Sequence, residues 1–148
     1  MASAYFIIPG NPQGKARART FYNPKIGRTQ SITPEKTVIY ENLVKQMFIE
    51  HTGEARWFDK EPLSMWIKAF YPIPKSTSKK NRQLMIDGKI LPTKKPDADN
   101  VAKVICDALN DVAYGDDTQI VKLTILKAYS EEPPRVEVLI ENLELGGD

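Results

Sequence analysis

Residues 95–123, KPDADNVAKVICDALNDVAYGDDTQIVKL, combine a helical apolar pattern, a strand-like run and six aspartates. Either Asp99 or Asn100 can accept the first free backbone N–H groups of a helix, so we predict that the helix begins there. Apolar residues then recur at the spacing of one buried stripe, at Val101, Val104, Ile105, Ala108 and Leu109. The stretch therefore predicts a helix that leads into a strand, with aspartates on both sides of the helix.

The remaining strands are predicted from short apolar runs. Residues 4–8 form such a run, which stops at a Pro-Gly pair and is followed by a loop. Residues 62–74 alternate as a half-buried strand does, with one face made by Leu63, Met65, Ile67, Ala69 and Tyr71. We predict a small hairpin at 85–91, and an antiparallel pair formed by the strands 118–129 and 135–143.

A further helix is predicted before the second strand. Thr33 is suited to the N-cap and Pro34 to the first helical position, while Gly53 is a stop signal. Apolar residues at 39, 43, 44, 47 and 48 would form its buried side. The expected fold is α+β, a mixed β-sheet packed by helices in the order β-α-β-α-β-β, in a single domain over 1–148.

The composition excludes several kinds of chemistry. A chain of 148 residues with 41% hydrophobic and 27% charged residues suits one globular domain. His51 and Cys106 are the single histidine and the single cysteine, so a structural zinc site or a Ser-His-Asp triad is a poor fit. We find no leader peptide and no apolar run long enough for a bilayer, and we expect a cytoplasmic protein without a membrane partner.

The charge is unevenly distributed, although the net charge is only +2. Residues 1–32 contain five basic residues and no acid, and residues 75–95 contain seven basic residues and one acid. Each run alone could be a solvated loop, but two of them together favour a surface that binds nucleic acid.

The segment GNPQGKA at 10–16 does not fit a phosphate-binding loop of nucleotide hydrolases, because only three residues separate its glycines and Ala16 follows the lysine. We therefore expect no nucleotide cofactor. Lys15, Arg17 and Arg19 alternate along this segment and are predicted to contact successive phosphates, with an ordinary exposed loop as the alternative.

Asp97 and Asp99 are two residues apart, so in an extended segment both carboxylates point the same way and could bind one Mg²⁺. For the pair alone, helix capping is the simpler alternative. Asp116 and Asp117 lie where the next strand begins, and only one of them can point toward the same site. The helix is expected to return the chain to the same end of the sheet, where three carboxylates would hold one or two metal ions.

Lys103 follows Asp99 by one helical turn. It could steady phosphate charge beside the metal, or it could form a surface ion pair with Asp99 or Asp107.

The segments KPDADNVAKVICDALND and YGDDTQIV closely resemble the core of RusA-type Holliday junction resolvases, and IPGNPQGKARAR is similar to the amino-terminal segment of phage and prophage members. The resemblance implies a homodimeric, Mg²⁺-dependent endodeoxyribonuclease that resolves four-way DNA junctions by paired nicks during recombination and repair, with Mn²⁺ as an alternative metal. Carried over by position, Asp97, Asp99 and Asp117 are the metal-binding catalytic acids and Lys103 is the active-site lysine. Lys94 and Lys95 occupy a region that is basic in relatives and are predicted to bind DNA.

Two rival functions remain open at this stage. The first is a protein that binds branched DNA through the same basic surface without cutting it. The second is a nuclease that prefers flaps or replication forks. The sequence does not choose between Asp116 and Asp117 except through their position before Gln119.

Overall fold

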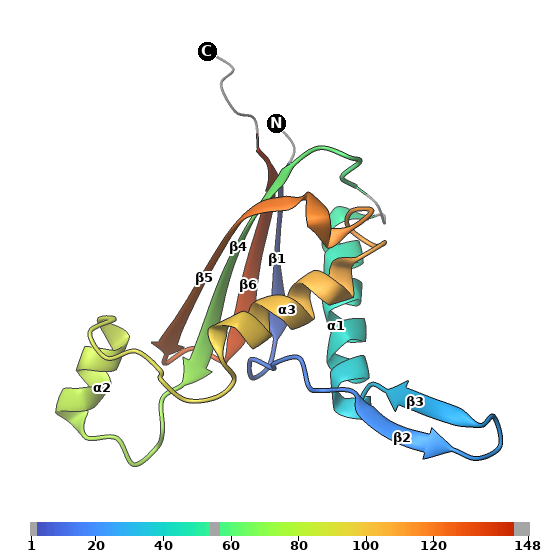
Figure 1. Ribbon diagram of the computed structural model, residues 1–148. Helices are drawn as coiled ribbons and strands as arrows, with labels where there is room; N and C mark the ends of the chain where they lie inside the picture. Colours follow the sequence, from blue (N-terminus) through green and yellow to red (C-terminus); the bar gives the residue numbers. More distant parts are fainter. Residues whose placement is uncertain (1–2, 54–56, 144–148) are drawn as a thin grey trace.

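The computed structural model describes residues 3–53 and 57–143. Four strands, β1 (Ser3–Pro9), β4 (Leu63–Pro72), β5 (Ile120–Ser130) and β6 (Arg135–Asn142), form one mixed sheet in the order β1-β6-β4-β5. The helices α1 (Glu35–Thr52) and α3 (Ala98–Leu109) pack against the same face of this sheet (Figure 1). The predicted α+β fold is confirmed. No helix in the described ranges is long and apolar enough to cross a bilayer.

Strand β4 is the central element of the sheet, parallel to β5 and antiparallel to β6. Its predicted face is confirmed, because all five alternating residues are buried: Leu63, Met65, Ile67, Ala69 and Tyr71. The opposite face of β4 is only partly covered, as expected for a sheet with helices on one side.

Helix α3 buries the predicted stripe of Val101, Val104, Ile105, Ala108 and Leu109 against the sheet. It begins earlier than predicted, since Asp97 occupies the N-cap position in place of Asp99 or Asn100. The Asp97 backbone is extended, as at an N-cap, and its carbonyl accepts the N–H of Val101 at 3.0 Å, which is the first hydrogen bond of the helix.

Helix α1 ends as predicted at Gly53, whose φ of 82° is easily adopted by glycine and whose N–H donates to the carbonyl of Ile49. The N-cap position is Pro34, so the prediction of Thr33 was wrong by one residue. The predicted apolar side was partly wrong as well, because Ile39 is 62% exposed. The helix is turned so that Thr37, Tyr40, Val44 and Phe48 are buried, and the Phe48 ring meets the Phe6 ring of β1 edge to face.

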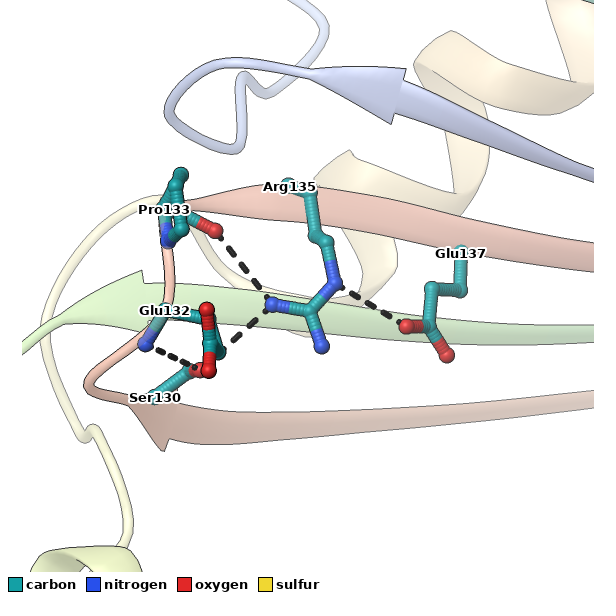
Figure 2. A network of polar contacts seen from close by, with 5 residues as sticks. All are labelled: Ser130, Glu132, Pro133, Arg135 and Glu137. Carbon is teal, nitrogen blue, oxygen red and sulfur yellow. Dashed lines mark hydrogen bonds and ion pairs between the residues drawn. The ribbon is translucent and has the colours of Figure 1, made fainter.

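The prediction that the last two strands pair with each other was wrong, because β4 lies between β5 and β6. The connection must therefore cross the end of β4 before β6 begins. Figure 2 shows how it is held: the Arg135 guanidinium donates to Glu137 Oε2 at 3.0 Å, to the Pro133 carbonyl and to Ser130 Oγ. The same guanidinium stacks 4.0 Å above the Phe70 ring of β4, which fastens the crossing to the strand beneath it.

Three further elements were not predicted, the two strands of a ribbon and one helix. The loop after β1 contains an antiparallel ribbon of β2 (Arg19–Asn23) and β3 (Arg28–Ile32), which projects from the body of the protein (Figure 1). Helix α2 (Lys79–Ile86) replaces the hairpin predicted at 85–91, because Asp87 and Gly88 end a helix there instead of forming a hairpin turn. None of β2, β3 and α2 contains a buried residue, so all three lack the apolar pattern by which elements are found in a sequence.

Candidate active site

Asp97 and Asp99 lie at the start of α3, beside the end of β4. The hydroxyl of Tyr71, at the end of β4, donates to the Pro96 carbonyl at 2.8 Å and so fixes the segment that carries both aspartates. Both aspartates are exposed, and the Asp97 carboxylate makes no capping hydrogen bond although it occupies the N-cap position. Helix capping therefore does not explain the Asp97 side chain, which keeps its acceptor oxygens for another partner.

An open cavity of about 590 Å³ adjoins Asp97. Its walls come from three separate parts of the chain: the segment 11–16, Lys36 in the first turn of α1, and Lys95 with Asn100 around the start of α3. The lining thus contains one aspartate and three lysines, Lys15, Lys36 and Lys95. Such a lining suits a phosphodiester, since cations can bind its oxygens while the carboxylate binds a metal ion.

The segment 11–16 is pressed against the start of α3. Its backbone is anchored where the Lys15 N–H donates to the Asn100 carbonyl at 3.0 Å. A Cβ at Gly14 would lie 3.0 Å from the Cβ of Pro96 and 3.1 Å from that of Asn100, so a residue without a side chain is needed for this close approach. GNPQGKA therefore acts as a strap over the segment that carries Asp97 and Asp99.

The Lys15 side chain is engaged inside the chain. Its ammonium group lies 2.9 Å from Glu41 Oε2 of α1 and 3.4 Å from Asp107 Oδ2 of α3, and the side chain is 23% exposed. Two carboxylates thus already balance its charge, and they tie the strap to both helices. The prediction of phosphate binding by this segment consequently depends on Arg17 and Arg19, which are exposed.

Asp117 lies at the opposite end of α3 from Asp97. The N–H of Asp117 donates at 2.9 Å to Oδ1 of Asn110, the C-cap residue of α3, whereas Asp97 is its N-cap residue. A helix of 12 residues is roughly 18 Å long, which sets the scale of the separation. Among the described residues, no group of three His, Cys, Asp or Glu side chains is placed to hold a metal ion.

The expectation that the helix returns the chain to the same end of the sheet was therefore wrong. The cause is the parallel pairing of β4 with β5. A crossover helix between parallel strands runs back along the sheet, so it begins at the end of the first strand and finishes near the start of the second. The two ends of α3 therefore lie toward opposite ends of the sheet (Figure 1).

Comparison with known protein families identifies the family of this chain. The family model of endodeoxyribonuclease RusA matches residues 9–141, nearly the whole chain. The protein is a member of the RusA family. A protein of Bacillus subtilis (strain 168), the uncharacterized protein YqaN, is 37% identical over 140 residues, which cover 93% of this chain and 95% of that protein.

The resemblance predicted from residues 95–122 is thus confirmed. RusA-family proteins are endodeoxyribonucleases, metal-dependent in general, that bind branched DNA. The chain is accordingly a phosphodiester hydrolase that acts on DNA.

The start of α3 fits a divalent cation in this RusA-family chain. Mg²⁺ binds oxygen ligands and commonly uses one or two carboxylates with water and substrate phosphate, and Asp97 and Asp99 provide two exposed carboxylates. The charge of Asp97 acts on the neighbouring Tyr71. Burial raises the pKa of Tyr71, and the nearby Asp97 carboxylate raises it further, to about 12.

Asp116 and Asp117 have different surroundings, which the sequence could not distinguish. Asp116 caps the short helix η1 (Asp117–Gln119), and hydrogen bonds from Thr118 and Asp117 lower its pKa. The pKa of Asp117 is raised, first by burial and then by the hydrogen bond and negative charge of Asp116 and the charge of Asp107. Asp116 thus has a local structural role, whereas the Asp117 carboxylate lies partly buried among like charges.

Gln119 holds the Asp117 segment in place. Its side-chain oxygen accepts the N–H groups of Gly115 and Asp116, and its amide nitrogen donates to the carbonyls of Asp59 and Glu61 before β4. A glutamine that bridges two loops this way fixes the start of β5 beside the start of β4.

The basic residues near α3 include one that the sequence did not reveal. Lys94 and Lys95 are exposed as predicted, and Lys127 of β5 joins them, since its ammonium group donates to the Lys94 carbonyl at 2.6 Å. Lys103 is exposed one turn after Asp99, while Asp107 is paired with Lys15. Lys127 could not be predicted because it contacts Lys94 only through the fold, as Lys36 reaches the cavity wall only through the fold.

Proposed function

We propose that this protein is a Mg²⁺-dependent endonuclease that resolves four-way DNA junctions by paired, symmetric nicks. The observation that carries the proposal is the pair Asp97 and Asp99 at the start of α3, with Asp97 in the wall of a lysine-lined cavity, in a chain of the RusA family. Lys36 and Lys95 would bind the oxygens of the phosphate to be cut, and Lys103 would steady its charge from the next turn of α3.

A divalent cation bound by Asp97 and Asp99 would activate the attacking water and neutralise the charge that develops on the leaving oxygen. Mn²⁺ could replace Mg²⁺, because both accept carboxylate and water ligands. The residues of the chain supply the remaining functions: the strap and Tyr71 hold the aspartates in position, and the lysines orient the phosphate.

Asp117 joins this site if a second copy of the chain supplies it. The resemblance assigns Asp117 to the same set of acids as Asp97 and Asp99, yet within one chain α3 separates them. A junction also requires two incisions related by symmetry, for which a twofold dimer with two equivalent sites is the simplest arrangement. A homodimer with composite sites satisfies both requirements.

The edge of the sheet offers a surface for such a dimer. Strand β5 has 11 residues and lies at the edge, hydrogen-bonded only to β4 within the described sheet. Val121, Leu123 and Leu126 are 58%, 48% and 42% exposed on it. A long edge strand with exposed apolar side chains tends to pair with another strand, and we propose that this strand is the β5 of a second copy.

Twofold pairing through β5 would bring the required acids together. A twofold axis perpendicular to the sheet makes the two β5 strands antiparallel and keeps both helix layers on one side. The start of one β5, which Asp117 precedes, then lies beside the end of the other. The segment that leads to Asp97 is fastened near that end, because Lys127 donates to the Lys94 carbonyl and Lys94 lies 5.9 Å from the centre of the Tyr129 ring.

The proposed function is tested by cleavage of synthetic DNA with and without Mg²⁺. We expect nicks at symmetric positions in a mobile four-way junction, slower or absent cleavage of a flap, a fork and a linear duplex, and no cleavage when the metal is chelated. Binding of the junction without cleavage under any metal would support the non-catalytic alternative. Faster cleavage of the flap or fork would show that a different branched DNA is preferred.

The exposed arginines that follow the strap are expected to bind phosphates. Replacing Arg17 and Arg19 by alanine should weaken junction binding and make the slope of log K against log salt shallower, by about 0.9 for each phosphate that the protein no longer neutralises. Binding isotherms at several salt concentrations measure this slope. Replacing Lys36 by alanine tests the cavity separately. An unchanged slope in the Arg17 and Arg19 variants would show that these two arginines do not belong to the DNA-binding surface.

A further inference from the structure

The ribbon formed by β2 and β3 is separate from the core. Its two strands form a sheet of their own, and no residue of either strand is buried. A two-stranded ribbon without a core is only marginally stable by itself in water. Large apolar side chains are nevertheless exposed on it: Phe21 at 41%, Tyr22 at 65%, Ile26 at 44% and Ile32 at 52%. Exposed apolar side chains on an element without a core are typical of a surface that binds a partner molecule.

The tip of the ribbon is well defined. Oδ1 of Asn23 accepts the N–H of Lys25 at 3.0 Å, and the carbonyl of Asn23 accepts the N–H of Gly27 at 2.9 Å. Gly27 has a φ of 67°, a value that favours glycine. The Asn23 side chain also donates to Gln30 on the neighbouring strand, so the turn fixes the register of the two strands.

The two faces of the ribbon have different chemistry. Residues paired across the strands share a face, so the pairs Arg19 with Ile32, Phe21 with Gln30 and Asn23 with Arg28 lie on one side. That face places an aromatic ring between two arginines. The other face has Tyr22 among hydroxyl side chains and contains no charge. No acidic residue occurs between Ser3 and Pro34, so the arginine face suits a polyanion.

We propose that this arginine face is an arm that recognises the branch of the DNA, with Phe21 stacked on a base at the branch point and Arg19 and Arg28 bound to the flanking phosphates. The inference rests on the proposed action on branched DNA and goes beyond it, because it names the feature that distinguishes a branch from a duplex. In a continuous duplex both faces of every internal base are stacked, whereas a branch point interrupts the stack. An aromatic ring flanked by cations binds such an exposed base face.

The test uses the full chain with Asp97→Asn, which keeps the DNA intact, and adds Phe21→Ala. Affinities are measured for a four-way junction and for a linear duplex of matched length and composition. We expect Phe21→Ala to weaken junction binding about 5- to 150-fold, the range for losing one stacked base, and to change duplex binding less than about twofold. The fluorescence of a 2-aminopurine at the branch point should change when the Asp97→Asn protein binds. This change should be lost when Phe21→Ala is added.

Three matched variants separate stacking from folding. Tyr22→Ala removes the more exposed aromatic ring from the opposite face and should leave the ratio of junction to duplex affinity unchanged. Phe21→Trp should preserve the ratio, because tryptophan also stacks, whereas Phe21→Leu should lower it although it keeps an apolar side chain. A separate change, Arg28→Ala, should weaken binding to both DNAs and flatten the salt dependence.

The outcomes distinguish this inference from the proposed function. If the Asp97→Asn protein prefers the junction and Phe21→Ala retains that preference, the role of Phe21 is refuted while the proposed function stands. Equal losses for Phe21→Ala and Tyr22→Ala would refute the assignment to the arginine face. If the Asp97→Asn protein binds junction and duplex equally, the action on branched DNA and the branch-recognising arm both fail.

Discussion

Replacing Asp97 by asparagine is expected to abolish Mg²⁺-dependent nicking of a four-way junction while junction binding is largely preserved. Asparagine keeps the size and the extended N-cap conformation, but it removes the negative charge that binds the cation. A metal ion contributes several kcal/mol to charge stabilisation in the transition state, so we expect the rate to fall by at least about 10²-fold. Asp99→Asn and Asp117→Asn should behave alike, measured under single-turnover conditions.

The matched control for these variants is Asp87→Asn at the end of α2. Asp87 is exposed and accepts a hydrogen bond from Gln83 Nε2, which the oxygen of an asparagine side chain can also accept. This variant changes the net charge by the same amount and should cut at the wild-type rate. Full activity of Asp117→Asn would contradict the three-acid assignment, and failure of Asp97→Asn to bind the junction would indicate a structural defect instead of a missing metal ligand.

A dimer that combines one Asp97→Asn chain with one Asp117→Asn chain is expected to recover nicking that neither homodimer shows. In a composite site, one half of this heterodimer contains both substitutions, and the other half contains Asp97 and Asp117 unchanged. One intact site in two should give about half the wild-type nicking rate, with cuts in only one strand. The heterodimer can be isolated with two different affinity tags and assayed on a junction labelled on each strand.

The decisive control is the heterodimer of Asp97→Asn with Asp99→Asn. These two residues lie at the same end of α3, so neither half of that dimer has an intact site under a composite arrangement. Recovery by the first heterodimer but not by the second supports a site shared between subunits. If neither heterodimer cuts while the wild-type dimer does, the composite site is refuted.

The elements with a strong local apolar pattern could be predicted from the sequence. The buried faces of β4 and α3 were predicted residue by residue, because alternation and helical spacing are local properties of the chain. The location of two aspartates at the start of α3 follows from the same local order, but the extended geometry predicted for the pair was wrong, because Asp99 lies in the first turn of the helix. Elements without a buried face gave no such signal, which is why β2, β3 and α2 were missed.

The pairing of strands could not be predicted in the same way. The last two strands are joined by only four residues, which favours a hairpin, yet β4 separates them, and the Arg135 network holds the crossing connection. Lys15 illustrates the same limit for a side chain. Its sequence context suggests a free cation beside other cations, but the fold brings Glu41 and Asp107 to it.

The sequence by itself determined which residues are candidates for the chemistry: the aspartates around α3, the lysine one turn along, and the basic segments. Only the tertiary structure decided where these residues lie. Because β5 pairs parallel to β4, α3 carries the chain to the opposite end of the sheet, and Asp117 is separated from Asp97 and Asp99. The physical reason is that the apolar periodicity of a helix or strand is set by neighbouring residues, whereas strand pairing depends on contacts between residues that are distant in sequence.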